Sequence, residues 1–230
     1  MKYSLDPIGI VHSPFKEKFG IPRQPGLVWV KSQIELLAPY NLPEAVSGLE
    51  GFSHIWVTFV FHQDMREQWS PLVRPPRLGG NRKVGVFASR SPFRPNHLGL
   101  SVVRLEKIEQ KDKKLLLHVC SFDVVDGTPV VEIKPYIPYV DRIEGAAAGF
   151  AVEAPQPVFQ VNFSESAEQQ LQEIDVEEFR QLVSEVLSYD PRPAYRQSES
   201  GGQFGILLDK YNVRWEVRDD RIWVFSINPA

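Results

Sequence analysis

The chain has 230 residues, of which 43% are hydrophobic and 24% charged, with a net charge of −3, values typical of a soluble globular protein. No apolar run approaches the length of a membrane span, and the single cysteine, Cys120, excludes an internal disulfide and a thiolate metal cluster. Because the first residues lack the apolar core of a signal peptide and a lone cysteine fits a reducing compartment, we expect a cytoplasmic protein.

Strands dominate the first 139 residues. Residues 54–62 are β-branched and aromatic without a break, which predicts a central strand buried on both sides. Together with tight turns at 111–113 and 126–129, the strands predict a closed or nearly closed β-barrel. Apolar or alternating runs predict the other strands at 8–13, 27–37, 84–88, 100–110, 115–120 and 130–133, and residues 43–49 predict one or two helical turns.

Two long loops interrupt these strands. Residues 14–26 are rich in proline and carry Lys16, Lys18 and Arg23, so this loop is either a plain connector or the wall of a ligand site. Residues 64–81 form a long irregular insert, and such inserts in compact domains are usually functional or mobile.

The stretch 85–101 places two arginines in a stiff loop. Arg90 and Arg94 are four residues apart, with Pro92 between them and Pro95 after them. Proline fixes φ and removes a donor, so this connection is neither regular helix nor central strand. Since the planar guanidinium suits carboxylate and phosphate groups, the loop is predicted to bind anions in an active site.

The C-terminal part has a different character. Residues 145–157 are nearly uncharged and predict a linker between a barrel domain, 1–144, and a small α+β domain, 158–230. Ser164 is a candidate N-cap for a helix at 165–173, and a second amphipathic helix is predicted at 176–189. Strands are predicted at 204–208, 211–217 and 221–227, so the fold class is mainly β with a small α+β domain.

Positive charge is concentrated in one region. Residues 70–105 contain no acidic residue, and a local field of this kind attracts polyanions although the whole chain is slightly acidic. Any one of the basic residues in this stretch could instead form an ion pair with an acidic residue from 141–190. The seven basic residues are Arg74, Arg77, Arg82, Lys83, Arg90, Arg94 and Arg104.

Several familiar sites are missing from the sequence. There is no G-x-G-x-x-G after a strand, no phosphate-binding loop and no G-x-S-x-G, and the five histidines lack metal-ligand spacing, so we expect no metal. Cys120 lies in an alternating run and is expected to be a buried, inert thiol.

The motifs IPRQPGL, FVFHQ, RPPRLGGN, GVFASRSPFRPN, DVVDGTPVVEIKPYIP and DPRPAYR together resemble the TrmO family, also called YaeB or TsaA-like. The resemblance covers nearly the whole chain, including the C-terminal domain of the bacterial long form. It implies a β-barrel tRNA methyltransferase that uses S-adenosyl-L-methionine and forms a homodimer, with the cofactor near the subunit interface. It also implies that N6-threonylcarbamoyladenosine, beside the anticodon, is methylated on N6.

The resemblance also implies the site residues. The accepting nitrogen is urea-like and a poor nucleophile, so a base would help on chemical grounds. Asp126 is the candidate base that removes the N6 proton, and the alternative leaves this proton to water. The arginine loop divides, with Arg90 on the cofactor side, Arg94 on the RNA side and Pro92 as a stiff spacer. The cofactor residues would be Arg23, Gln24, Pro25, His62, Gln63, Arg90, Leu100, Asp126, Gly127, Thr128 and Pro129. The tRNA-binding residues would be Arg94, Asn96, Arg192, Tyr195 and Arg196, while His97 has no catalytic role.

Two other functions stay open on the residues alone. The basic stretch also fits a non-catalytic RNA-binding barrel, which would bind tRNA but no cofactor. A hydrolase that uses His62 and Asp126 is a weaker alternative. Tyr195 could stack on a base or could pack inside the small domain.

Overall fold

The computed structural model describes residues 3–63, 68–174, 177–193 and 202–230. The chain divides into two compact units. The first contains Met1–His12, Lys31–Phe122 and Gly127–Glu153, and the second contains Ser13–Val30, Asp123–Asp126 and Ala154–Ala230. None of the helices in the described ranges is long and apolar enough to cross a membrane.

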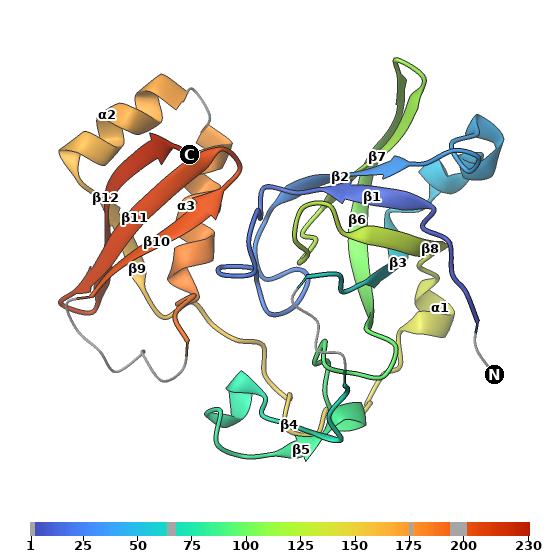
Figure 1. The fold of residues 1–230 in the computed structure, drawn as a ribbon, viewed down its shortest axis with the longest axis horizontal. Coiled ribbons are helices and arrows are strands. Elements are labelled where there is room, and N and C mark those ends of the chain that lie inside the picture. Colours follow the sequence, from blue (N-terminus) through green and yellow to red (C-terminus); the bar gives the residue numbers. More distant parts are fainter. Residues whose placement is uncertain (1–2, 64–67, 175–176, 194–201) are drawn as a thin grey trace. The chain divides into compact units, whose positions relative to one another are not determined.

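The first unit is a closed six-stranded barrel, as the sequence predicts, with the strands in the order β1-β2-β7-β6-β3-β8 (Figure 1). All its strand pairs are antiparallel. The strands are β1 (Gly9–His12), β2 (Lys31–Leu36), β3 (His54–Val60), β6 (Leu98–Lys111), β7 (Lys114–Cys120) and β8 (Pro129–Pro135).

Strand β3 shows how the barrel interior is built. Ile55, Val57 and Phe59 are buried, whereas the residues between them are only half-buried, so the expectation of burial on both sides is wrong. A barrel is a single sheet layer, and only its inner face is removed completely from water. Gly99 on β6 lies beside this interior, and a Cβ there would come within 2.3 Å of the Phe59 ring.

Short elements fill the connections of this unit. The helical turns expected near residue 43 are two 3-10 helices, η1 (Pro43–Val46) and η2 (Leu49–Gly51). The run 84–88 is a strand only in β5 (Val84–Gly85), which pairs with β4 (Leu72–Val73). It then turns into η4 (Val86–Ala88), because the amide and the hydroxyl of Ser89 both donate to the Val86 carbonyl. The remaining elements are η3 (Pro76–Leu78) and α1 (Pro138–Asp141).

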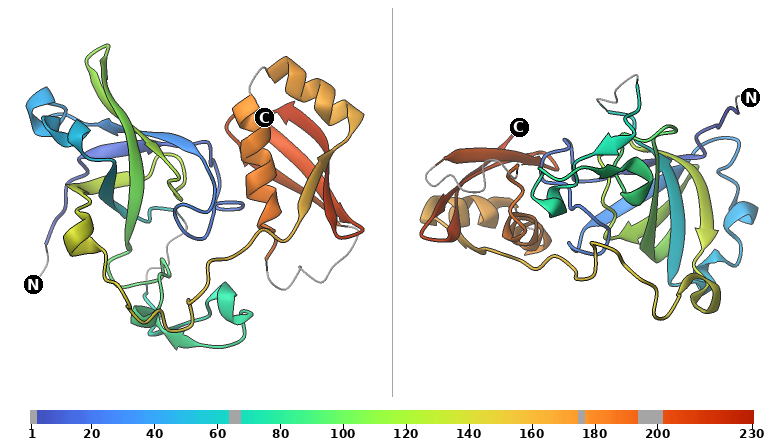
Figure 2. Two further views of the ribbon diagram at one scale, coloured as in Figure 1. Left: turned by 180° about the vertical axis from the view of Figure 1, so that it is seen from behind. Right: turned by 90° about the horizontal axis from the view of Figure 1, so that it is seen from below.

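The second unit is a four-stranded sheet, in the order β10-β11-β12-β9, with two helices on one face (Figure 2). Ser164 caps the first helix as predicted, since its hydroxyl accepts from the Ala167 amide at 3.2 Å. The sequence did not predict β9, which has only four residues and runs parallel to β12. The elements are β9 (Gln160–Phe163), α2 (Glu165–Ile174), α3 (Glu177–Ser188), β10 (Gln203–Leu208), β11 (Tyr211–Arg218) and β12 (Arg221–Pro229).

The proline-rich loop between β1 and β2 is part of this second unit and is therefore more than a plain connector. Phe15 is 1% exposed and joins the hydrophobic core of the unit, where it forms an isolated β-bridge with Leu208. The Glu17 carboxylate accepts from the Leu207 amide at 2.9 Å. Gly20 has φ +87°, and a Cβ there would lie 1.9 Å from Ile206, so only glycine fits.

Candidate functional site

The end of the barrel at which β3 ends and β6 begins gathers several of the predicted residues. Val60 pairs with Leu98, and the amide of Phe61 donates to the His97 carbonyl at 2.8 Å. The polypeptide after β3 and the arginine loop before β6 therefore meet here. The predicted residues that this end carries are His62, Gln63, Arg94 and Asn96.

The turn before β8 lies at the same barrel end. Val130 pairs with Phe59 on one side and with Gly9 on the other. The turn is bound to β1, because the Gly127 amide donates to the Val11 carbonyl at 2.8 Å and the Val11 amide donates to the Thr128 carbonyl at 3.0 Å. Of the predicted cofactor residues in this turn, Thr128 is buried and Gly127 is exposed.

Hydroxyl groups, as well as prolines, fix the arginine loop. The Ser89 hydroxyl accepts from the Ser91 amide, and the Ser91 hydroxyl accepts from the Phe93 amide, both at 3.3 Å. The Arg94 amide donates to the Pro92 carbonyl at 2.8 Å. This chain of local bonds holds the backbone between the two arginines in one conformation.

The two arginines of this loop differ in exposure. Arg90 and Asn96 are exposed, whereas Arg94 is half-buried. His97 follows with φ +51°, in the left-handed region, and its ring nitrogen Nδ1 lies 3.2 Å from the Pro92 carbonyl. His97 thus has a conformational role in closing the loop.

Leu100 presents an apolar surface on the outside of the barrel. It pairs with Thr58 across β3 and β6, and its neighbours Gly99 and Ser101 are buried. Leu100 itself is 55% exposed. An exposed leucine beside the arginine loop could cover the apolar part of a ligand.

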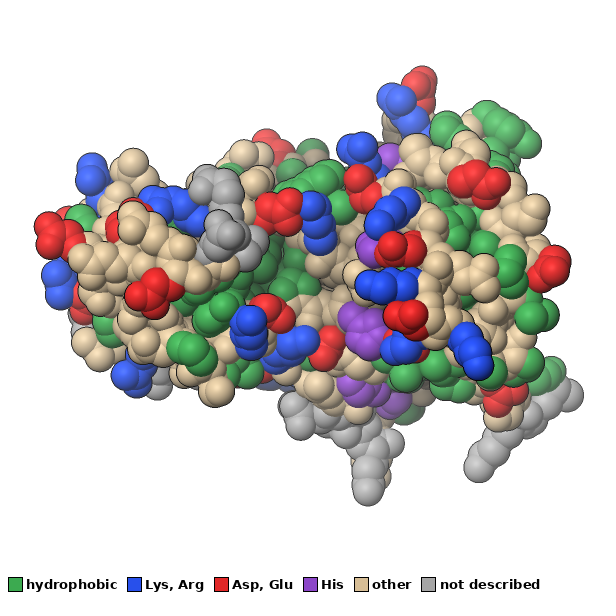
Figure 3. All heavy atoms as spheres, turned by 90° about the horizontal axis from the view of Figure 1, so that it is seen from above, with side chains coloured by type: hydrophobic (Ala, Val, Ile, Leu, Met, Phe, Trp, Pro, Cys, Tyr) green, Lys and Arg blue, Asp and Glu red, His purple; other side chains and the backbone are tan. Residues whose placement is uncertain are grey.

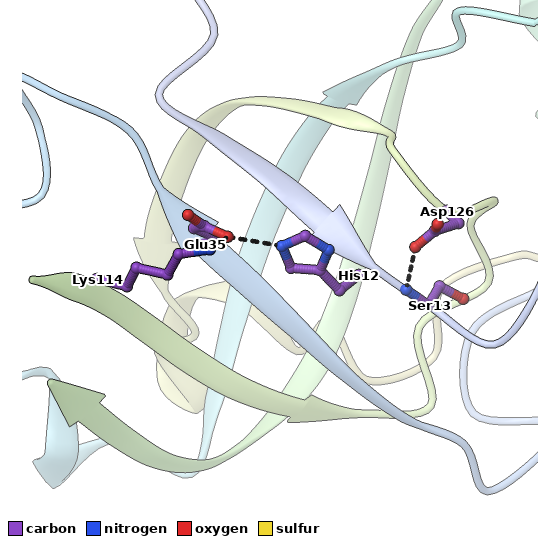
Figure 4. Close-up of polar contacts among 5 residues, drawn as sticks. All are labelled: His12, Ser13, Glu35, Lys114 and Asp126. Atoms are coloured by element: carbon purple, nitrogen blue, oxygen red, sulfur yellow. Dashed lines mark hydrogen bonds and ion pairs between the residues drawn. The ribbon is translucent and has the colours of Figure 1, made fainter. Parts of the chain in front are cut away.

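The outer face of β1, β2 and β7 carries acidic, basic and histidine side chains side by side (Figure 3). Nε2 of His12 lies 2.8 Å from the Glu35 carboxylate, which also accepts from Lys114 at 3.1 Å (Figure 4). The His12 and Lys114 contacts hold the pKa of Glu35 below its ordinary value of 4.5. In the same way, hydrogen bonds from His118 and Lys107 lower the pKa of Glu109.

Asp126 holds together the two chain segments that meet at its turn (Figure 4). Its Oδ1 accepts from the Ser13 amide at 2.8 Å. Its Oδ2 lies 3.0 Å from Nζ of Lys16. Lys16 also donates to the Ser13 carbonyl at 2.9 Å, and the Asp126 amide donates to the Phe15 carbonyl at 2.8 Å. Both carboxylate oxygens therefore have protein partners, which favours a positioning role over proton removal.

The predicted cofactor residues Arg23, Gln24 and Pro25 lie in the second unit, on the loop that leads to β2. Arg23 is exposed, and the Gln24 side-chain amide donates to the Arg23 carbonyl at 2.6 Å. Gly26 follows with φ +79°, a value that favours glycine at this turn.

Arg192 lies in the interior of the second unit. Its side chain is 1% exposed, and Nε and Nη2 donate to the two Asp190 oxygens at 2.7 and 3.0 Å. The guanidinium also lies against the rings of Phe159 and Phe204. In this position it stabilises the fold and presents no surface to a phosphate. The other two predicted tRNA residues of this segment, Tyr195 and Arg196, lie outside the described residues.

Two family models cover most of the chain. Residues 10–142 match the tRNA-methyltransferase O N-terminal domain, and residues 156–230 match the TrmO C-terminal domain. The chain is 47% identical to the tRNA (adenine(37)-N6)-methyltransferase of Escherichia coli K12, over 99% of this chain and 98% of that protein. The chain belongs to the TrmO family.

Further TrmO relatives agree with this assignment. A Pseudomonas aeruginosa protein named as a putative S-adenosylmethionine-dependent methyltransferase is 45% identical over 99% of this chain and 98% of its own length. The crystal structure of TrmO from Pseudomonas aeruginosa matches with a TM-score of 0.80 at 39% identity, covering 100% of this chain and 98% of that one. The barrel and the small α+β fold are therefore those of the TrmO family.

For this TrmO-family chain, the possible metal ligands and the single cysteine are the remaining reactive groups. In the described part of the chain, no group of three or more His, Cys, Asp or Glu side chains could hold a metal ion. Cys120 is 0% exposed, and burial raises the pKa of its thiol to about 11, as expected of an inert side chain.

Lys16 as the partner of Asp126 could not be predicted from the sequence, because no local signal reveals a pair that is 110 residues apart. Trp69 and Phe87, which are 48% and 75% exposed, were not among the predicted site residues. Their signal was available, because aromatic residues that flank a basic run are typical of RNA-binding surfaces.

Proposed function

We propose that the protein transfers the methyl group of S-adenosylmethionine to N6 of N6-threonylcarbamoyladenosine, beside the anticodon of a tRNA. The full-length relation to the Escherichia coli tRNA (adenine(37)-N6)-methyltransferase carries this proposal. The structure supports it with a barrel end that brings an arginine loop, two strand ends and a tight turn together.

Residues of the arginine loop and of the start of β6 suit the parts of the cofactor. The exposed guanidinium of Arg90 suits its carboxylate, and the exposed face of Leu100 suits its adenine ring. When bound, S-adenosylmethionine supplies an electrophilic methyl group on a cationic sulfur. The protein then has to align this group with the accepting nitrogen and exclude water, and a protein nucleophile is not needed.

We assign Asp126 to positioning. Its carboxylate binds Ser13 and Lys16, so it fixes the turn that carries Gly127 and Thr128. The N6 proton would then pass to water. The earlier hypothesis that Asp126 is the base requires its carboxylate to release one of these partners.

The RNA and the subunit arrangement complete the proposal. Arg94 and Asn96, which close the arginine loop, would contact the tRNA, and phosphate contacts would make binding salt-dependent.

A homodimer with the cofactor near the subunit interface follows the family resemblance. Light scattering, which measures the molar mass in solution, tests the homodimer. A mass of 26.3 kDa, that of one chain, would contradict it.

Methyl transfer from labelled S-adenosylmethionine tests the function. The protein is incubated with tRNA that carries or lacks the threonylcarbamoyl group, and label is expected on the modified tRNA alone. Equal label on both, or label on neither, would contradict the specificity. A non-catalytic RNA-binding barrel would bind tRNA but give no heat with S-adenosylmethionine, and a hydrolase would stay active after exhaustive cofactor removal.

A further inference from the structure

The hairpin segment, residues 68–90, extends from the barrel as a small two-stranded ribbon of its own (Figures 1 and 2). Its strands β4 and β5 are two residues each, with Leu72 opposite Gly85 and Val73 opposite Val84. The Val86 amide donates to the Pro71 carbonyl at 3.0 Å and extends the pairing. The ribbon thus holds the residues at its two ends beside each other.

Two aromatic side chains face solvent where the two ends of the ribbon meet. Trp69 is 48% exposed and Phe87 is 75% exposed. Their ring centroids are 6.5 Å apart, and their planes differ by only 24°. Leu72, on strand β4 of the same ribbon, is 51% exposed. Rings that served only the core would be buried, so this near-parallel pair leaves flat apolar faces available to a ligand.

Positive charge lies on the same segment as these rings. The hairpin segment contains five basic residues and no acidic residue. Arg74, Arg82 and Lys83 are exposed, and none of them has an ion pair or hydrogen bond with another described side chain. Arg77 donates to the Glu153 carbonyl, which anchors the ribbon to the chain after α1. The free charge therefore lies on the same small element as the exposed rings.

We propose that the hairpin segment binds single-stranded RNA, with Trp69 and Phe87 stacking on unpaired bases and with Arg74, Arg82 and Lys83 contacting phosphates. Base stacking requires bases that are not already paired, and a tRNA anticodon loop presents such bases. The choice of tRNA as the RNA rests on the proposed function. A protein partner is less suited, because it would have to bring compensating acids to the exposed charges of Arg74, Arg82 and Lys83.

The stacking half of the proposal is tested with Trp69→Ala and Phe87→Ala, and with Trp69→Phe and Phe87→Tyr as conservative variants. Tyr139→Ala is the matched control, since Tyr139 is an 88% exposed aromatic residue on α1 of the same unit. The probes are an anticodon stem-loop RNA and a fully paired duplex of equal length. Each alanine variant should weaken stem-loop binding about 10- to 100-fold and duplex binding much less, while the conservative variants and the control bind normally.

The charge half is tested with the double variant Arg82→Gln/Lys83→Gln against the double variant Lys111→Gln/Lys113→Gln. Both pairs are exposed in the same unit and remove the same charge. Loss of two phosphate contacts should lower the slope of log Kd against log salt by about 1.4, from about 0.7 per contact to a single strand. The Lys111/Lys113 variant should keep the native slope.

Steady-state kinetics separates this proposal from the proposed function. In the aromatic variants, KM for tRNA should rise while KM for S-adenosylmethionine stays unchanged. Unchanged RNA affinity and unchanged KM for tRNA would overturn the proposal and would leave the hairpin segment as a protein contact surface. If the native protein bound RNA but transferred no methyl group, the proposed function would fail while the RNA-binding hairpin segment stood.

Discussion

Replacement of Arg192 by methionine separates two roles for this side chain. The motif around it predicted a tRNA contact, whereas its side chain is 1% exposed and forms two hydrogen bonds to Asp190, itself 5% exposed. Methionine fills part of the same space but leaves a buried carboxylate without its counter-ion. Removing one partner of a buried ion pair costs about 3–5 kcal/mol, so we expect a loss of that size in the free energy of unfolding.

A combined variant isolates the charge effect. Asp190→Asn removes the carboxylate, and asparagine tolerates the positive φ of +50° at this position. The double variant Asp190→Asn/Arg192→Met should therefore lose less stability than Arg192→Met alone. Arg142→Met, at an exposed pair with Glu144, is the control and should change stability by less than about 0.5 kcal/mol.

Urea unfolding followed by tryptophan fluorescence measures these differences. Trp215 is fully buried in the second unit and stacks on Phe204, with ring centroids 4.8 Å apart, so it reports on the packing near Arg192. The tRNA affinity is measured under conditions where circular dichroism shows a folded variant. If Arg192→Met kept its stability within about 1 kcal/mol and weakened tRNA binding with a smaller salt dependence, the side chain would bind RNA and our reasoning would be refuted.

Three further predictions concern the cofactor, the turn and the pH dependence. Arg90→Ala should lower S-adenosylmethionine affinity by about 1–3 kcal/mol in calorimetry, and an unchanged Kd would remove Arg90 from the cofactor site. Asp126→Asn and Lys16→Gln should both raise KM for the cofactor with a native pH–rate profile; a loss of about 100-fold or more in kcat for Asp126→Asn alone would make Asp126 the base. The hydrogen bond from Arg180 lowers the pKa of Glu168 below 4.5, so this pair stabilises the protein above about pH 4.5 and its contribution is lost as the pH falls through the folded pKa. Glu168→Gln should thus cost about 0.5 kcal/mol at pH 7, since the pair is partly exposed, and urea unfolding should show this cost shrink as the pH is lowered below 4.5.

The barrel could be predicted from the sequence because its signals are local. Alternation along β7 follows from one face that lines the interior, and the turn at Asp112 and Lys113 has positive φ at both residues, as a tight hairpin requires. Strand β9 could not be found in this way. It has four residues and forms by pairing with β12, about 60 residues later. A run this short shows no alternation that would identify it as a strand.

The loop between β1 and β2 shows a second limit of local reasoning. Its prolines and glycines predict an irregular segment, and this prediction is correct. That Phe15 enters the core of a unit built mainly from residues 154–230 depends on contacts across almost 200 positions. The same holds for the Lys16–Asp126 pair, which decides between a base and a positioning residue.

The fixed backbone of the arginine loop supports separate roles for Arg90 with the cofactor and Arg94 with the RNA. The two guanidinium groups are four residues apart, and the hydroxyls of Ser89 and Ser91 fix the backbone between them. The Arg94 amide donates to the Pro92 carbonyl, so the backbone turns at this proline before it reaches β6. Because a fixed backbone with a turn between two side chains keeps them from converging freely on one anion, replacing Arg90 and Arg94 one at a time should affect different ligands.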